Sequence, residues 1–219
     1  MSAGEFVGID LGGRLVHAVR LRSGERGKLR IRTAAIIDAG DDETLTAFCE
    51  TADRVAIDAP SALSRRRHSR DRSLSQKFRV ARCCEIAPGQ EHKAWAPWVT
   101  PSRKSACSSW MVTGFSVWTT LRQAAHEPRE TYPHAVFLAL GGKMPSKATA
   151  AGRRARVAAL ATRVTLPTGI EHWSHDGLDA MAAAVVAADG DDGVCASHDH
   201  PDHDGSAIWL PRPTRVRAS

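Results

Sequence analysis

Three acidic side chains lie at the ends of short apolar runs that are far apart in the chain. Asp10 ends the run EFVGID, Asp58 ends RVAID, and Glu130 lies within PRETY. Functional groups gather at strand ends in open α/β sheets, where the chain leaves the packed core. Asp176 and Asp179 are three residues apart, so a helix would carry them on adjacent turns of one face. We therefore expect these acids to converge.

Clustered carboxylates suit the hydrolysis of phosphodiester bonds. That reaction adds negative charge to an anionic centre, and two hard cations roughly 3.5–4 Å apart stabilise it while activating water. Magnesium and manganese prefer oxygen ligands, which carboxylates supply. The predicted catalytic residues are Asp10, Asp58, Glu130 and Asp179, and the predicted ligands of Mg²⁺ or Mn²⁺ are these four together with Asp176.

Each acid also has a simpler interpretation. Asp10 before two glycines could form an Asx turn, and Asp58 before Ala-Pro could cap a turn. Glu130 could pair with an arginine. Asp176 could equally be an N-cap or first-turn acid of its helix. A single strand-end acid favours these structural roles, whereas the whole set in this order favours a catalytic site.

The elements that must position these acids follow from the apolar pattern. Turn signals separate three β-rich runs, which predicts an antiparallel meander, and a helix and a fourth strand follow. The expected ranges are Glu5–Leu11, Leu15–Arg22, Leu29–Ile37, the helix Asp41–Thr51 and the strand Arg54–Asp58.

Later in the chain, helical spacing of apolar residues predicts three more helices. Their expected ranges are Ser108–Ala125, Lys147–Val164 and Asp176–Ala188, and Gly190 would end the last of them. A polar, flexible loop is expected at about 189–205. Ala207–Leu210 is predicted as a final short strand.

The segment from about 61 to 126 reads as an insertion that is basic and rich in tryptophan. Its arginines at 65–72 follow directly after Asp58, which favours contact with a phosphate backbone. The predicted nucleic-acid-binding residues are Arg65, Arg66, Arg67, Arg70 and Arg72. The tryptophans of the insertion could stack on bases, but packing of the insertion onto its domain is the preferred interpretation.

Composition sets the broad class of the protein. A chain of 219 residues suits one domain with an insertion, and 42% hydrophobic residues indicate a folded globular protein. The net charge of +6 favours a polyanionic partner. No apolar run reaches the roughly 18 residues that a membrane span needs. Five cysteines in no paired pattern favour a reducing cytoplasm.

Several motifs resemble the DUF429 family, which is described as predicted nucleases of ribonuclease H-like fold. The resemblance spans almost the whole chain, and HDGLDA (His175–Ala180) is also similar to the final-helix motif of RuvC-type resolvases. The motifs are GIDLGG (Gly8–Gly13), VAIDAPSAL (Val55–Leu63), RCCE (Arg82–Glu85), ETYPHAVF (Glu130–Phe137), KATAAGRRAR with a following leucine (Lys147–Leu160), HDGLDAMAAAVVAA (His175–Ala188) and the terminal AIWLP (Ala207–Pro211).

The resemblance implies an α/β fold of the ribonuclease H-like type. Its mixed sheet would have three antiparallel strands followed by parallel strands, flanked by helices, in one domain over residues 1–219. It also implies that Asp10, Asp58, Glu130 and Asp179 bind metal, with Asp176 as a possible fifth acid. The expected function is a metal-dependent nuclease acting on DNA or RNA.

Two other classes of function remain open at this point. An actin-like ATP-dependent phosphotransferase shares the same core, but no second glycine-rich phosphate loop with an aspartate occurs in the sequence. A non-catalytic nucleic-acid-binding module would need only the basic insertion. Tight ATP binding would favour the first, and salt-sensitive binding without cleavage would favour the second.

Overall fold

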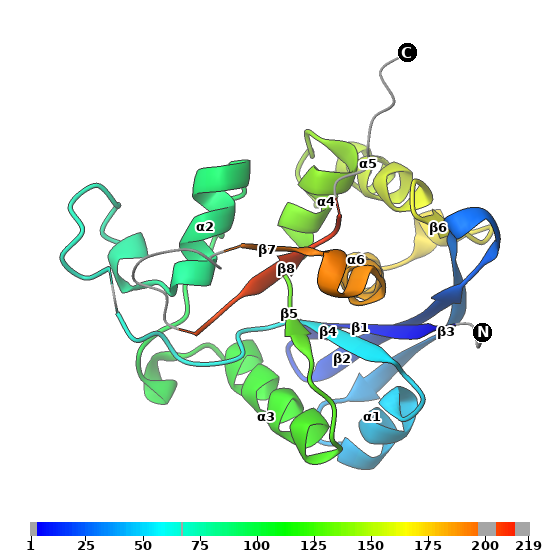
Figure 1. Ribbon diagram of the computed structural model, residues 1–219, viewed down its shortest axis with the longest axis horizontal. Helices are drawn as coiled ribbons and strands as arrows, with labels where there is room; N and C mark the ends of the chain where they lie inside the picture. The colour runs from blue at the N-terminus through cyan, green and yellow to red at the C-terminus, as the bar shows by residue number, and fades with distance from the viewer. Residues whose placement is uncertain (1–3, 67, 197–204, 213–219) are drawn as a thin grey trace.

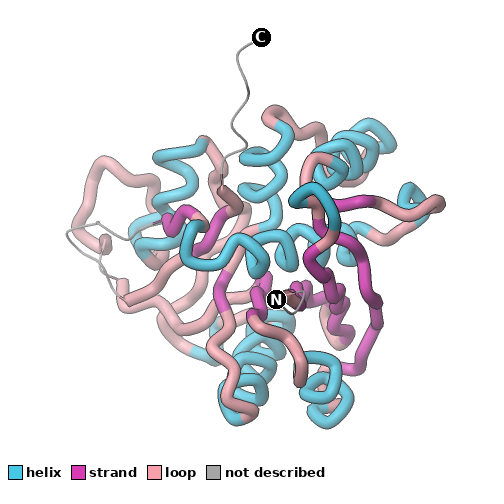
Figure 2. Tube along the Cα trace, turned by 45° about the vertical axis from the view of Figure 1, so that its right-hand side comes forward, coloured by secondary structure: helices cyan, strands magenta, loops and turns pink. Residues whose placement is uncertain are grey.

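The computed structural model describes residues 4–66, 68–196 and 205–212, and its centre is a mixed six-stranded sheet (Figure 1). The strands stand in the order β5-β4-β1-β2-β3-β6. Their bounds are β1 (Glu5–Gly12), β2 (Leu15–Ser23), β3 (Leu29–Asp38), β4 (Arg54–Asp58), β5 (Arg129–Glu130) and β6 (Val164–Thr165). The strands curl between the helices, as Figure 2 shows in magenta.

The first three strands form the predicted antiparallel meander, and β4 pairs in parallel with β1. β5 adds to β4 in parallel at one edge, and β6 adds to β3 in parallel at the other. The helix predicted over Lys147–Val164 is shorter in the structure, because Thr149 caps its start and the chain at Val164 joins the sheet instead.

Helices cover both faces of the sheet (Figure 1). Strand alternation sends Val7 and Ile9 to the face covered by α1 (Asp42–Cys49) and α3 (Ser109–Gln123). The opposite face is covered chiefly by α6 (His175–Asp189), with α4 (Pro133–Gly141) and α5 (Ala150–Ala161) packed against it. Asp10 and Asp58 occupy the alternate positions and therefore point to the α6 face.

Helix α6 lies unusually close to β1. Five of its eleven buried residues are alanines, which leave little side chain between helix and sheet. A Cβ on Gly8 would come within 2.0 Å of the Ala184 backbone nitrogen and 2.1 Å of the Ala180 carbonyl oxygen. Only glycine allows this backbone contact. The first turns of α6 are thereby held next to the end of β1, where Asp10 lies.

The segment predicted as one insertion divides into two parts. Helix α3 packs on the main sheet, with Val117, Trp118 and Leu121 in the same core as β1 and β4. The preceding part carries α2 (Cys83–His92), a helix that the sequence pattern did not predict. Near α2 lies a separate two-stranded sheet, β7 (Val194–Ala196) with β8 (Ile208–Leu210).

Strand β7 falls within the loop expected at about 189–205, so that expectation was wrong at Val194–Ala196. Residues 197–204 and Arg67 lie outside the described residues. Short 3-10 helices occur at Glu25–Gly27, Phe78–Val80, Lys104–Ala106, Ile170–His172 and Gly190–Asp192. Within the described ranges, none of the helices is both long and apolar enough to cross a membrane.

Candidate metal-binding active site

Asp10 and Asp58 stand side by side at the ends of two neighbouring parallel strands. The register pairs Asp10 of β1 directly with Asp58 of β4, and the charge of Asp58 acts on Asp10. Asp10 is only 6% exposed, and Oδ1 of Asp58 is buried without a hydrogen-bond partner. The protein alone therefore leaves part of the hydrogen-bonding capacity of these buried carboxyl oxygens unused.

Helix α6 brings two further acids to this pair. Ser174 caps the helix by accepting a hydrogen bond from the Gly177 backbone nitrogen, so Asp176 lies in the first turn and Asp179 one turn later. The charges of Asp176 and Asp179 both act on Asp10. Four of the five predicted metal ligands are thus gathered at one end of the sheet. They are Asp10, Asp58, Asp176 and Asp179.

Burial and mutual repulsion raise the pKa values of Asp10, Asp58 and Asp179. Burial is the largest cause for Asp10, whose pKa lies well above its ordinary value, and the charge of Asp58 adds to it. Burial likewise raises the pKa of Asp58 to about 7, against a lowering by the hydrogen bond from Asp10. Burial raises the pKa of Asp179, although the Arg156 and Lys147 charges oppose it. One proton or a cation is needed to hold these groups together.

Glu130 has a different environment from the aspartates. Its carboxylate receives two hydrogen bonds from the Arg82 guanidinium, one of them Nη1 to Oε2 at 2.8 Å, and a third from the Ser61 backbone nitrogen at 2.8 Å. Arg82 is 1% exposed and also binds Glu85. Glu130 is near enough for its charge to raise the pKa of Asp58. In the structure, Glu130 accepts hydrogen bonds from a buried arginine. The sequence analysis gave Glu130 two possible roles, metal binding and pairing with an arginine, and this contact is the second.

Two basic side chains border the aspartates. Arg156 Nη1 lies 2.9 Å from Asp179 Oδ1, and Lys147 Nζ lies 3.6 Å from Asp179 Oδ2. Arg156 is buried, whereas Lys147 is half exposed. Both side chains line a cavity of about 350 Å³ that also contacts Asp58 and Asp179. The site therefore combines acids with positive charge at the wall of an open space.

The donor set fits a hard divalent cation. Carboxylate oxygens are the preferred ligands of magnesium and manganese, and the orphaned Oδ1 of Asp58 is a buried acceptor that a cation would satisfy. Across residues 4–66, 68–196 and 205–212, no three His, Cys, Asp or Glu side chains have the spacing of a formed metal site. Asp179 points one oxygen to Arg156 instead.

A single family model covers most of the chain. It is described as "Protein of unknown function (DUF429)" and matches residues 8–204. This chain belongs to the DUF429 family. No curated protein matches the chain in sequence.

Solved structures that resemble this DUF429 protein include two of RuvC. Thermus thermophilus RuvC has 14% identity and a TM-score of 0.42, and the match covers 82% of this chain and 90% of that one. T. thermophilus RuvC in complex with Holliday junction substrate has 13% identity and a TM-score of 0.41, with the same coverages.

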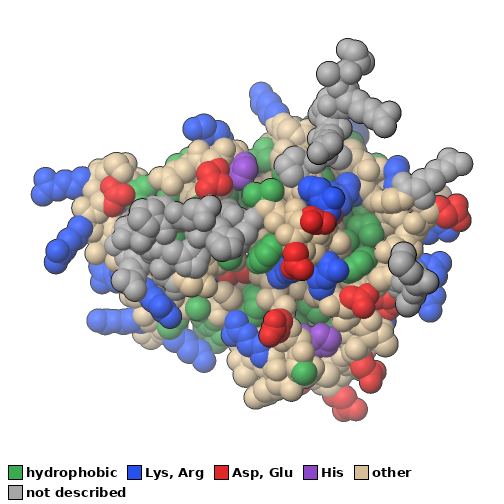
Figure 3. Space-filling model, in the orientation of Figure 1, with side chains coloured by type: hydrophobic (Ala, Val, Ile, Leu, Met, Phe, Trp, Pro, Cys, Tyr) green, Lys and Arg blue, Asp and Glu red, His purple; other side chains and the backbone are tan. Residues whose placement is uncertain are grey.

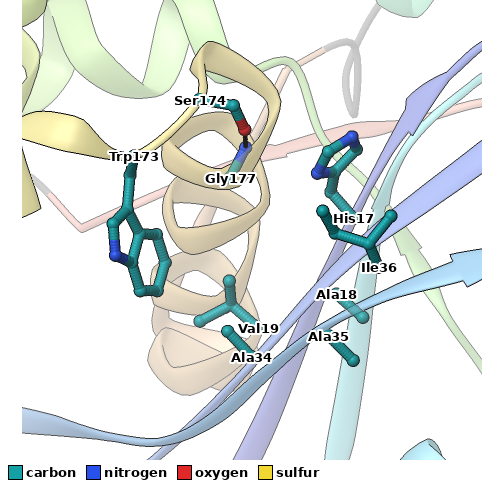
Figure 4. A pocket seen from close by; sticks show the side chains of 9 residues that line it. All are labelled: His17, Ala18, Val19, Ala34, Ala35, Ile36, Trp173, Ser174 and Gly177. Atoms are coloured by element: carbon teal, nitrogen blue, oxygen red, sulfur yellow. Dashed lines mark hydrogen bonds between the residues drawn. The ribbon is translucent and has the colours of Figure 1, made fainter.

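His17 is a neighbour of the site that the sequence analysis missed. It pairs with Asp10 across the β1–β2 hairpin, and its Nε2 lies 3.5 Å from Asp176 Oδ2. A second cavity of about 360 Å³ extends from His17 between β2, β3 and the start of α6 (Figure 4). That cavity is lined mainly by alanine, valine and Trp173. It is therefore largely apolar, whereas the cavity beside Lys147 and Arg156 carries positive charge.

The predicted arginine cluster lies on the loop between β4 and α2. Arg65, Arg66, Arg70 and Arg72 are exposed, and none forms an ion pair within the described part of the DUF429 chain. Figure 3 shows lysine and arginine side chains projecting from the end of the molecule that this loop forms. Arg67 lies outside the described residues. The four exposed arginines are available to an external anion.

The metal-free protein is expected to lose stability as the pH rises from about 6.5 to about 8. The folded pKa values of Asp10 and Asp58 exceed the ordinary value of 3.8, so the folded state binds more protons in this window. Their contribution to the free energy of unfolding is complete below pH ~4 and is lost as the pH rises through their pKa values in the folded state. Burial lowers the pKa of His134, so its contribution to the pH dependence of stability has the opposite sign. That contribution changes only at pH values below about 6.5, the ordinary pKa of histidine.

Thermal denaturation in EDTA measures this pH dependence. Magnesium at about a hundred times its Kd should add about 2.7 kcal/mol to the free energy of unfolding. The gain should be larger at pH 8 than at pH 6.5, because the cation replaces the lost protons. A Tm that rises with pH over this window in EDTA would contradict the assignment of raised pKa values.

Proposed function

We propose that this protein is a divalent-metal-dependent nuclease of ribonuclease H-like fold. The observation that carries the proposal is the register pair of Asp10 and Asp58, joined by Asp176 and Asp179 from one helix beside a basic cavity. Buried like charges without a compensating cation are costly, and such costs concentrate at functional sites. A structural role alone would not require four acids at one point.

The roles of the acids follow from their surroundings. Asp10 and Asp58 would hold Mg²⁺ or Mn²⁺, with Asp176 and Asp179 completing the carboxylate set. Bound there, divalent ions would activate water and stabilise the charge that develops during phosphodiester cleavage. Glu130, held by Arg82, would fix the end of β4 and the loop after it rather than bind metal.

The basic groups would bind the substrate. Lys147 and Arg156 border Asp179 and would draw the anionic phosphate towards the carboxylates. Arg65, Arg66, Arg70 and Arg72 would contact the backbone further along the nucleic acid. His134 lines the cavity, and its lowered pKa keeps the imidazole neutral near pH 7, so it can accept a proton. The cysteine pattern continues to predict a cytoplasmic location.

Cleavage assays on branched, single-stranded, duplex and RNA–DNA hybrid substrates test this function. We expect cleavage of at least one class in magnesium or manganese and none in EDTA. Folded protein that cleaves nothing with either ion would refute the proposal. If it then binds nucleic acid with an affinity that falls steeply with salt, the non-catalytic binding module becomes the better assignment.

A further inference from the structure

The cavity beside the aspartates has two chemically different walls. Lys147 and Arg156 form the basic wall, and Trp95, Trp98 and Tyr132 form the aromatic wall. Its volume of about 350 Å³ lies within the range of about 300–1,000 Å³ that is usual for small-molecule sites. A cation beside a set of flat rings suits a ligand with one anionic end and one planar, polarisable end.

The basic wall contains a buried donor that the protein does not satisfy. Arg156 is held by Asp179 and by the Phe137 ring, whose centroid is 4.6 Å from the guanidinium carbon. Its Nε is buried and has no hydrogen-bond partner within the described chain. Lys147 beside it reaches solvent, with 56% of its side chain exposed. These two groups together provide donors for one phosphate.

The aromatic wall is fixed in place by other rings. The centroid of Trp98 lies 4.9 Å from that of Trp110 and 6.3 Å from that of Tyr132, in edge-on contacts. Trp95 packs on Phe78 at 4.7 Å but remains 41% exposed. An exposed tryptophan on a rigid support is a ready stacking surface for a base.

We propose that this cavity binds one unpaired nucleotide next to the scissile phosphate. Its phosphate lies against Lys147 and Arg156, and its base lies against Trp95 and Trp98. A base inside a continuous duplex is stacked on both faces and cannot contact these rings, whereas an unpaired base can. This inference rests on the proposed nuclease function and specifies its substrate class: nucleic acid with an unpaired nucleotide at the site.

Fluorescence anisotropy in EDTA tests the pocket without any cleavage. The probes are labelled oligothymidylate, oligouridylate and a blunt DNA duplex of equal length. Trp95→Ala should weaken binding of the single strands about tenfold, the effect of losing one stacked base, and change duplex binding less than twofold. Trp95→Phe should retain most of the affinity. Trp173→Ala, in the other cavity, is the matched control and should leave single-strand binding unchanged.

A second variant allows the proposal to be tested even if the Trp95→Ala protein does not fold. Lys147→Gln changes a half-exposed side chain and should reduce the salt dependence of single-strand binding by about 0.7 in the log–log slope. Equal losses on single strands and duplex for Trp95→Ala, or an unchanged slope for Lys147→Gln, would overturn the proposal. Stronger binding of one single strand than of the other identifies DNA or RNA as the natural source.

The outcomes also separate the pocket from the nuclease. Selective loss of single-strand binding without metal-dependent cleavage would support the pocket and refute the catalytic function. Cleavage that proceeds equally on a continuous duplex, with Trp95→Ala as active as the wild type, would support the nuclease and refute the pocket.

Discussion

Replacing Asp10 by Asn is expected to slow metal-dependent cleavage about a thousandfold, which corresponds to about 4 kcal/mol of transition-state stabilisation. Asn keeps the shape of the side chain but removes its negative charge. Its amide can still donate a hydrogen bond to Asp58, so the fold should persist. In EDTA the variant should be at least as stable as the wild type, because one of the mutually repelling buried acids is gone.

The matched control is Asp191→Asn, the same chemical change just beyond the opposite end of α6. Asp191 is an exposed partner of Arg129 and touches no part of the site. This variant should cleave at the wild-type rate. Full cleavage by Asp10→Asn in magnesium would reject the assignment, and the loss of its thermal transition would show that Asp10 is needed for folding.

Replacing Arg82 by Met is expected to destabilise the protein by about 3–5 kcal/mol, the usual cost of removing one partner from a buried ion pair. Arg82 is 1% exposed and lies between Glu85 and Glu130, which are nearly as deeply buried. Without the guanidinium, two carboxylates would face each other in a dry environment. Glu85 also accepts hydrogen bonds from Thr100, so the loss would extend into the segment before α3.

Urea denaturation measures this loss, with Arg103→Met as control. Arg103 is an exposed arginine of the same region, and its replacement should change stability by less than about 0.5 kcal/mol. In a protein that already carries Glu130→Gln, Arg82→Met should lower the free energy of unfolding by less than it does in the wild type, because the two residues interact directly.

Glu130→Gln also separates the two roles that the sequence left open. A buried anchor predicts reduced stability with cleavage retained in the folded fraction. Abolished cleavage in a fully stable Glu130→Gln protein would instead restore the role as metal ligand.

Local chemistry explains what the sequence alone determined. Turn residues at Gly12-Gly13 and strand alternation set the first hairpin, and these two local signals suffice to place Asp10 at a strand end. The spacing of Asp176 and Asp179 on one helix face followed from helix periodicity. His17 could have been found in the same way, because a two-residue turn at Gly13 fixes its pairing with Asp10.

Only the tertiary structure decided which groups actually meet. The bond between Arg82 and Glu130 joins residues 48 positions apart, and no periodicity encodes such a partner. The place of α6 depends on the contact between Gly8 and Ala184, and the aromatic wall depends on how the segment before α3 folds back beside Tyr132. Sequence pattern reports local backbone preference, whereas these contacts arise from packing between elements that are distant in the chain.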